Sequence, residues 1–217
     1  MSGEIQPTFD SGNLYLDSIY VLSSGVKIKV QDIKFYASAI DLDGVEYSDY
    51  SLYNYRDHGV TWFQKTVSAA PSGALTYGIG VDLTKNHADP STFPSSSALN
   101  TLNANDMYWT WSSGFIFVKV EGKADTVVDG VDNFDVSFSY HLGNDANYIS
   151  GQTQILNPVQ SSSNDYKYLL KMDIKKFFEN AGSSINIASE NYTHSETGNE
   201  ALTNKFKTNF ASCISPL

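Results

Sequence analysis

The sequence predicts an all-β protein: a β-sandwich with Greek-key-like, immunoglobulin-like layers, long loops and a short C-terminal helix. Tyrosine and phenylalanine are abundant, at 14 and 12 of 217 residues, and such side chains favour half-buried strands. Short apolar or alternating segments recur between turn residues. Apolar residues at helical spacing occur near the end, in Leu202, Phe206 and Phe210. We therefore expect one sandwich domain over residues 12–217, preceded by a polar lead over residues 1–11.

Strands are predicted wherever these segments occur. In chain order they are Leu14–Tyr20, Gly25–Val30, Ile33–Ile40, Trp62–Val67, Leu75–Val81, Phe115–Val120, Asn133–Leu142, Gln154–Val159 and Tyr166–Ile174. The first two are expected to pair as a hairpin. Turns are predicted at Asp41–Gly44 and Ala70–Gly73, and a long surface loop with one helical turn at Asp82–Asn105. Asp173–Asn180 is predicted to be a short helix and Glu200–Ala211 the terminal helix.

The segment Asn105–Gly122 contains two of the three tryptophans, Trp109 and Trp111. Their spacing of two places both rings on one face of a strand. Either they belong to an aromatic ladder in the core, or one indole lies at a functional site. Buried or ligand-bound positions both suit tryptophan, so the spacing leaves the two interpretations open.

The composition limits the partners of the chain. Its net charge is −10 and its pI about 4.7, which argues against nucleic acid and anionic membranes. The opening MSGEIQPTF has no apolar leader, and no segment is apolar enough to span a bilayer. The chain is thus either cytosolic or a mature segment whose signal was removed. The single cysteine, Cys213, cannot form an internal disulfide.

None of the four histidines shows metal-binding helical spacing. His141 is the strongest candidate for a site, because it ends a well-alternating strand where loops are expected to cluster. There Phe134, Val136, Phe138 and Tyr140 should share one face and His141 the other.

Acidic loop residues are candidate oxygen ligands for calcium. They are Asp82, Asn86 and Asp89, with Asp41 and Asp43 from an earlier turn. The spacing of an EF-hand is absent, so a solvated acidic loop is the preferred interpretation. No GxSxG motif or prominent carboxylate pair is present, and the lone cysteine lies near the end, so we expect a protein that is not an enzyme.

Five segments spread along the chain carry a family resemblance. They are Ile33–Gly44 (IKFYASAIDLDG), Tyr77–Asp82 (YGIGVD), Met107–Gly122 (MYWTWSSGFIFVKVEG), Ser139–Gly143 (SYHLG) and Asn204–Phe210 (NKFKTNF). In this order they resemble the MbnP-like family, named for the periplasmic partner of the methanobactin system and similar to the copper-binding surface proteins CorA and MopE of methanotrophs. The sequence departs from the family at Phe115, where tyrosine is usual, and at Ser51, where many members have histidine.

The resemblance implies a β-sandwich exported to the periplasm or outer-membrane surface, often as a lipoprotein, with its signal or lipoprotein segment already removed. Copper-binding members hold Cu(I) with two histidines and a nitrogen of kynurenine. A dihaem cytochrome-c-peroxidase-like enzyme (the MauG/MbnH type) makes the kynurenine by oxidising a tryptophan. An indole N–H only donates, whereas the product has a nitrogen that can bind the metal.

Carried over to this sequence, the resemblance implies His141 as one copper ligand. The modified tryptophan is Trp109 or Trp111, with Trp109 preferred. The second histidine is His194 or His58, and no motif decides between them. The alternative function is a non-catalytic binding or adhesion module that keeps the scaffold without metal and stacks exposed Tyr and Trp side chains on a glycan or protein ligand.

Overall fold

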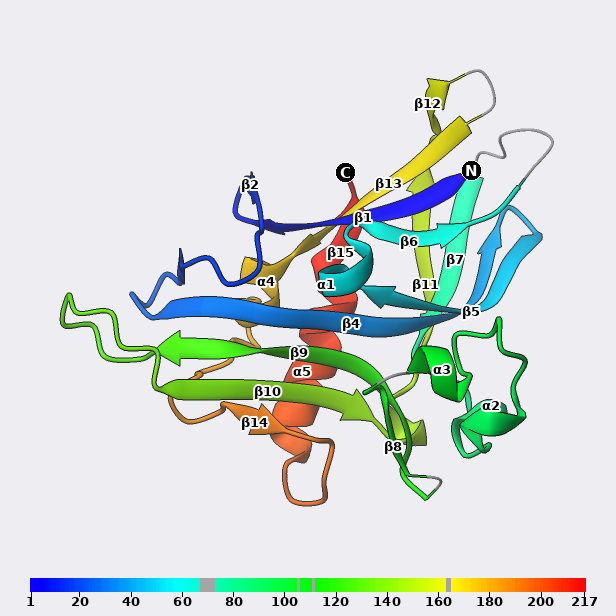
Figure 1. The fold of residues 1–217 in the computed structure, drawn as a ribbon. Helices are drawn as coiled ribbons and strands as arrows, with labels where there is room; N and C mark the ends of the chain where they lie inside the picture. The colour runs from blue at the N-terminus through cyan, green and yellow to red at the C-terminus, as the bar shows by residue number, and fades with distance from the viewer. Residues whose placement is uncertain (67–72, 105, 111, 163–164) are drawn as a thin grey trace.

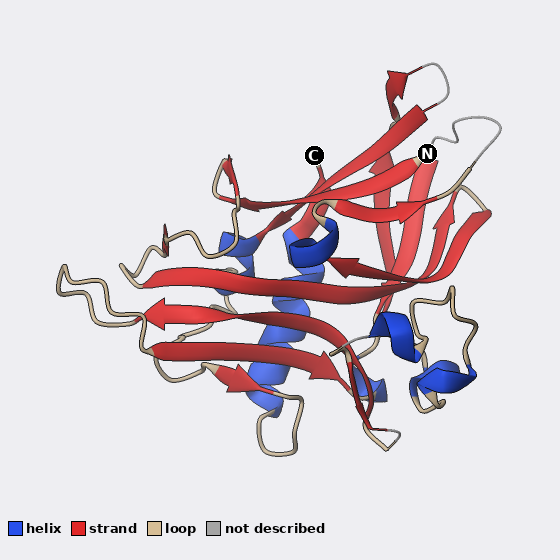
Figure 2. Cartoon of the chain, viewed as in Figure 1, coloured by secondary structure: helices blue, strands red, loops and turns tan. Residues whose placement is uncertain are grey.

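The computed structural model describes residues 1–217 except 67–72, 105, 111 and 163–164. Two curled β-sheets dominate the described residues, and the helices are few and mostly short (Figures 1 and 2). This arrangement confirms the predicted all-β, sandwich-like fold. Within the described residues, no helix has the length and apolar character needed to cross a membrane.

The smaller sheet contains strands from both ends of the chain. Its strands are β1 (Ser2–Phe9), β2 (Gly12–Asn13), β6 (Thr61–Gln64), β12 (Val159–Ser162), β13 (Asp165–Asp173) and β15 (Ile214–Pro216). The order is β12-β13-β1-β2, with β15 paired to β13 and β6 paired to β1. The N-terminal strand β1 runs parallel to β13.

The larger sheet carries the middle of the chain. Its strands are β3 (Tyr20–Val21), β4 (Lys27–Leu42), β5 (Val45–Asn54), β7 (Gly73–Ile79), β8 (Tyr108–Thr110), β9 (Gly114–Asp125), β10 (Val136–Gly143), β11 (Ile149–Leu156) and β14 (Tyr192–Thr193). The order is β11-β7-β4-β9-β10-β14. β3 and β5 pair with β4, and β8 pairs with β9.

The helices fill the space beside the sheets. They are α1 (Tyr55–His58), α2 (Leu83–Asn86), η1 (Pro90–Thr92), α3 (Thr101–Ala104), η2 (Asp145–Asn147), α4 (Ile174–Phe178) and α5 (Glu200–Cys213). The predicted terminal helix is α5, which lies behind β9 and β10 in Figure 1. Its Phe206 packs against Phe177 of α4, and its Phe210 against Phe35 of β4, with ring centroids 5.3 and 5.4 Å apart. These aromatic contacts form the core on the inner face of the larger sheet.

The predicted polar lead over residues 1–11 is wrong. Residues Ser2–Phe9 form β1, and Ile5 is fully buried. β1 lies between β13 and β6 within the smaller sheet. Its sequence looks polar, but small side chains and partners more than 50 residues away bury it, so local composition could not reveal the strand.

Four further expectations differ from the structure. The predicted strand Gln154–Val159 is not continuous, because it includes the end of β11 and the first residue of β12, which belong to different sheets. Most of Leu14–Tyr20 is not a strand, because only Tyr20–Val21 pairs with β4. The segments Gly25–Val30 and Ile33–Ile40 largely merge into the single strand β4, whose pairing with β9 shifts between Val30 and Asp32. The long loop after β7 contains α2, η1 and α3 rather than one helical turn. Part of the predicted turn Ala70–Gly73, and Val67, lie outside the described residues.

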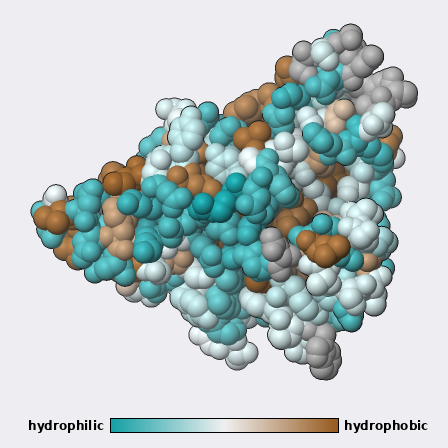
Figure 3. Space-filling view, in the orientation of Figure 1, coloured by the Kyte–Doolittle hydropathy of each residue, from teal (hydrophilic) through white to brown (hydrophobic). Residues whose placement is uncertain are grey.

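The segment from α2 to β8 covers one end of the outer face of the larger sheet (Figure 1). Tyr36 and Phe115 point outward there and meet edge to face at 5.6 Å, and Tyr108 packs on Phe115 at 4.9 Å. Beyond this cover the same face becomes polar, and Figure 3, in the same view, shows a largely hydrophilic surface. The candidate site lies where the cover ends.

Candidate functional site

Strand β10 presents different side chains to its two faces. Phe138 and Tyr140 point inward and pack on Phe178 and Phe177 of α4, with ring centroids 5.5 and 5.9 Å apart. Because side chains alternate along a strand, Ser139 and His141 point to the outer face. This confirms the prediction that His141 opposes the aromatic face, although Phe134 lies before the strand begins.

The register of the sheet brings polar side chains beside His141. On β9, Glu121 pairs with Ser139, and Lys119 pairs with His141. On the other side, Tyr140 pairs with Thr193 of β14, so His194 follows directly at the sheet edge. A row of polar side chains therefore crosses β9, β10 and the end of β14.

Three rings meet in this row. The imidazoles of His141 and His194 are stacked, with centroids 4.1 Å apart and planes within 7° of parallel. The indole of Trp109, on β8, lies 6.4 Å from the His141 ring and 6.1 Å from the His194 ring. The structure thus brings together Trp109, His141 and His194 from segments far apart in sequence.

Trp109 is held in place by the close approach of its indole to a glycine. A Cβ atom added at Gly143 would lie 2.4 Å from Cζ3 of Trp109. Tyr108, the preceding residue, points the other way onto Phe115. Trp111, the other candidate for modification, lies outside the described residues.

A network of charges, in which the two lysines are buried, connects the tryptophan segment to His141. Asp106, three residues before Trp109, accepts hydrogen bonds from Lys34, at 2.8 Å, and from Lys119. Lys119 Nζ lies 3.3 Å from Oε2 of Glu121. The other oxygen of Glu121, Oε1, is 2.7 Å from Nε2 of His141. The two buried lysines are tolerated because each has charged partners, whereas the carboxylates are partly exposed, at 45% for Asp106 and 33% for Glu121.

The surroundings shift several pKa values. Burial would raise the pKa of Glu121, but the hydrogen bond from His141 and the charge of Lys119 outweigh it and lower that pKa. Burial would also raise the pKa of Asp106, but the hydrogen bonds and charges of Lys119 and Lys34 outweigh it and lower that pKa to about 2. Burial, followed by the neighbouring His141, lowers the pKa of His194. The acidic groups are therefore ionised, and His194 is neutral, near pH 7.

The donor set suits a metal ion in one specific respect. Nδ1 of His141 is buried and has no hydrogen-bond partner among the residues that the structure describes, which is unusual for an imidazole nitrogen. Imidazole lone pairs lie in the ring plane, so two parallel rings 4.1 Å apart cannot both direct one at the same ion unless a ring turns. Among the described residues, no three His, Cys, Asp or Glu side chains form a group that could hold a metal. A metal here would therefore require a ligand from outside these residue types, or a turn of one ring.

The remaining histidines lie elsewhere. His58, the alternative second ligand, ends α1 and lines a different hollow of about 470 Å³ with residues of β5 and of the segment before β8. α1 packs on β4, which β9 and β10 separate from β14. His87 lies 3.0 Å from Asp145 through its Nε2. Neither is part of the ring cluster.

Four of the five candidate calcium ligands, all but Asp43, have a local structural role. Asp82 and Asp89 cap α2 and η1, and Tyr50 also donates to Asp82. Asn86 is fully buried, accepts from the Phe115 N–H at 2.8 Å and donates to Asp145. Asp41 accepts from the N–H of Gly44 in its turn. Calcium binding stays a prediction, and these roles offer it no support.

Sequence reasoning missed Glu121, Ser139 and Tyr192. Oγ of Ser139 lies 3.3 Å from Glu121 Oε1 and 3.4 Å from His194 Nε2. The hydroxyl of Tyr192 lies 3.0 Å from Nδ1 of His194. Glu121 lies inside Met107–Gly122, the most distinctive of the resembling segments, and this position could have marked it as a candidate site residue. Ser139 opens the resembling segment Ser139–Gly143, whereas Tyr192 becomes visible only through the strand register.

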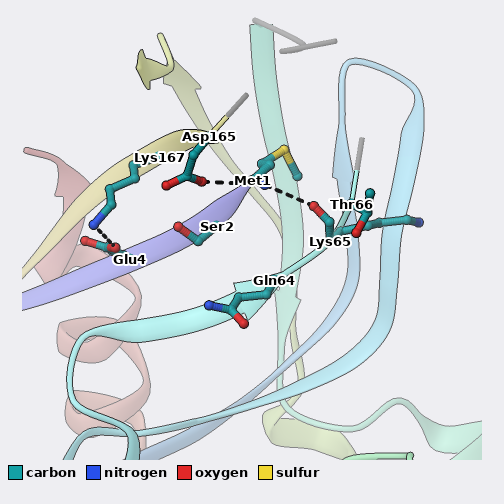
Figure 4. Close-up of a pocket in the computed structure, with 8 residues that line it drawn as sticks. All are labelled: Met1, Ser2, Glu4, Gln64, Lys65, Thr66, Asp165 and Lys167. Carbon is teal, nitrogen blue, oxygen red and sulfur yellow. Dashed lines mark hydrogen bonds and ion pairs between the residues drawn. The ribbon is translucent and has the colours of Figure 1, made fainter. Parts of the chain in front are cut away.

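A separate hollow of about 430 Å³ opens beside the N-terminus (Figure 4). Its lining includes ion pairs of Lys167 with Glu4 and of the Met1 amino group with Asp165. None of the described residues that line it is a histidine or a tryptophan. It is therefore distinct from the ring cluster.

Fold and site together define an all-β, two-sheet protein with a histidine–tryptophan cluster on the outer face of its larger sheet. The sequence matches the MbnP family over residues 2–197, and the chain belongs to that family. Among solved structures it is similar to MbnP from Methylosinus trichosporium, with 14% sequence identity and a TM-score of 0.54. That match covers 92% of this chain and 85% of the other. The search of curated proteins gives no match.

Proposed function

We propose that this chain is an exported copper-binding protein, in which His141, His194 and Trp109, or a kynurenine formed from Trp109, bind Cu(I). The observation that carries the proposal is the cluster itself. Two imidazoles and an indole, from β10, the residue after β14, and β8, meet, and one buried imidazole nitrogen has no partner among the described residues. Neutral imidazole suits copper.

The residues of this chain have distinct parts in the proposed site. His141 would offer Nδ1, and His194 would offer a nitrogen after its ring turns out of the stack. Trp109 would become a ligand only after oxidation, because an indole N–H is a donor only. A dihaem cytochrome-c-peroxidase-like enzyme of the MauG/MbnH type is the partner proposed for that oxidation, and the periplasm or outer-membrane surface the location.

The test is a Cu(I) titration of the protein produced with and without the peroxidase-type partner. We expect stoichiometric binding, and a mass change at Trp109 when the tryptic peptide that contains it is fragmented. The double variant His141→Ala/His194→Ala should lose binding, whereas His58→Ala should retain it. Unchanged binding in the double variant would refute the ligand set, and loss in His58→Ala would restore the alternative histidine.

The alternative of a glycan- or protein-binding module stays a prediction. Trp109 is half-buried, with an edge against Gly143 of β10 and its ring beside His194, so little of the ring is open to a sugar face. Glycan binding that survives Trp109→Ala would separate this alternative from the copper site.

A further inference from the structure

The two nitrogens of His141 have opposite surroundings. Its side chain is buried, with 7% of the residue exposed. Nε2 lies 2.7 Å from a carboxylate oxygen of Glu121, whereas Nδ1 has no hydrogen-bond partner in the described part of the chain. A neutral imidazole carries one proton, and which nitrogen holds it is determined by the partner of the other. The unequal partners of the two nitrogens therefore indicate which nitrogen of His141 carries the proton.

Glu121 can only accept. Its other oxygen, Oε2, lies 3.3 Å from the ammonium of Lys119, which itself pairs with Asp106. An ionised carboxylate offers lone pairs and no hydrogen. The short contact to His141 is thus a hydrogen bond only if Nε2 carries the proton.

The hydroxyl of Ser139 does not favour a proton on the other nitrogen of His141. Its hydroxyl oxygen lies 3.3 Å from the same Glu121 oxygen and 3.2 Å from Nε2 of His141. The hydroxyl satisfies Glu121 by donating to it, and its lone pairs remain for the histidines. Both groups beside Nε2 therefore favour a proton on that nitrogen.

The neighbouring His194 is not fixed in this way. Its Nδ1 lies 3.0 Å from the hydroxyl of Tyr192, and its Nε2 lies 3.4 Å from Oγ of Ser139. Hydroxyl groups can donate or accept, so they allow either tautomer. The two stacked imidazoles are therefore chemically unequal.

We infer that Glu121 is a positioning residue that holds His141 as its Nε2–H tautomer, so that Nδ1 is the nitrogen offered to an incoming electrophile. If the proposed function holds, that electrophile is Cu(I), and the assignment of the metal to Nδ1 rests on it. The tautomer itself does not depend on copper. A carboxylate that orients a metal-binding histidine through its far nitrogen typically changes metal affinity by about 10- to 100-fold.

The test is nitrogen NMR of the metal-free protein labelled at histidine, at a pH where the imidazoles are neutral. We expect the His141 signals to show a pyridine-type Nδ1 and a pyrrole-type Nε2. A protonated Nδ1 in the wild-type protein would overturn the inference without any variant.

The matched substitution is Glu121→Gln. Lys119 should draw the carbonyl oxygen of the new amide, which turns its NH₂ group toward Nε2 of His141 and moves the proton to Nδ1. The control is Glu46→Gln, at an exposed position, which should leave the signals unchanged. An Nε2–H tautomer that persists in a folded Glu121→Gln protein would overturn the role of Glu121.

A Cu(I) titration of the same samples separates this inference from the proposed function. The expected result is the Nε2–H tautomer in the wild-type protein with copper affinity weakened about 10- to 100-fold in Glu121→Gln. The expected tautomer without copper binding would refute the function and leave the positioning role intact. Stoichiometric copper binding with the Nδ1–H tautomer would refute the positioning role of Glu121 and leave the proposed function intact.

Discussion

Replacing Gly143 with alanine should push the indole of Trp109 out of its position. The added Cβ would lie 2.4 Å from Cζ3 and 2.8 Å from Cη2 of the ring, and 3.1 Å from the carbonyl oxygen of Phe115. Ordinary contact begins at 3.4 Å, so the ring must move by about 1 Å, the difference between 3.4 and 2.4 Å. The indole is rigid and β8 is a short strand, so the movement must come from the strand or from a new rotamer.

Overpacking of this kind costs about 1–3 kcal/mol. Urea unfolding of Gly143→Ala should therefore show a free energy of unfolding lower by that amount. The indole N–H signal of Trp109 in the proton NMR spectrum should also shift, because the ring moves relative to two imidazoles. Gly12→Ala is the control, since its Cβ would meet only a carbonyl oxygen at 3.9 Å, and it should change stability by less than about 0.5 kcal/mol.

The decisive comparison is made in a protein that lacks the indole. If the clash is with Trp109, Gly143→Ala should lose most of its effect in the Trp109→Ala background, and a double-mutant cycle would measure the coupling. An equal loss of stability in both backgrounds would show that the carbonyl of Phe115, and not the indole, limits this position.

Three further outcomes are expected. Asn86→Ala should lower the free energy of unfolding by about 1–3 kcal/mol, because the buried N–H of Phe115 would lose its acceptor; an unchanged urea midpoint would contradict this. The pKa of Asp106 is lowered from 3.8 to about 2, so its contribution is complete above pH 3.8 and lost as the pH falls toward 2. Asp106→Asn should therefore flatten the pH dependence of stability in that acid range, and an unaltered acid profile would count against the ion network. Phe210→Ala should cost about 3–5 kcal/mol, whereas Leu102→Ala, which is 79% exposed, should cost less than about 0.5 kcal/mol; similar calorimetric melting temperatures for the two would contradict the packing of α5.

The sequence predicted those elements whose patterns are local. The alternation around Phe138 and Tyr140 located β10 and the face of His141, and the helical spacing of Phe206 and Phe210 located α5. β1 escaped prediction because its burial depends on β13, some 165 residues away in register. Composition describes a segment and not its partners.

The same distinction applies to the site. His141 was singled out by its strand pattern and again by the family resemblance, and Trp109 was preferred on the resemblance. His194 was one of two open choices that only the fold could separate. Nothing local marked Glu121 as a partner of His141, because that contact depends on which residues of β9 and β10 face each other. A shift of one residue in this pairing would turn Glu121 to the inner face and leave Nε2 of His141 without an acceptor.

The unequal setting of the two imidazoles also bears on how a ligand would enter. His141 lies on a strand flanked on both sides and is held by a carboxylate, whereas His194 follows a two-residue edge strand beside Tyr192, which is 48% exposed. Two parallel rings cannot share one ion, so one ring must turn, and the edge position makes His194 the ring with fewer restraints. A ligand arriving from solvent would therefore find a fixed nitrogen on His141 and a movable one on His194. Tyr192→Phe, which removes the hydroxyl from Nδ1 of His194 and leaves Glu121 in place, should accordingly broaden or shift the NMR signals of His194 and not those of His141. Equal changes at both rings would show that the stack moves as one unit.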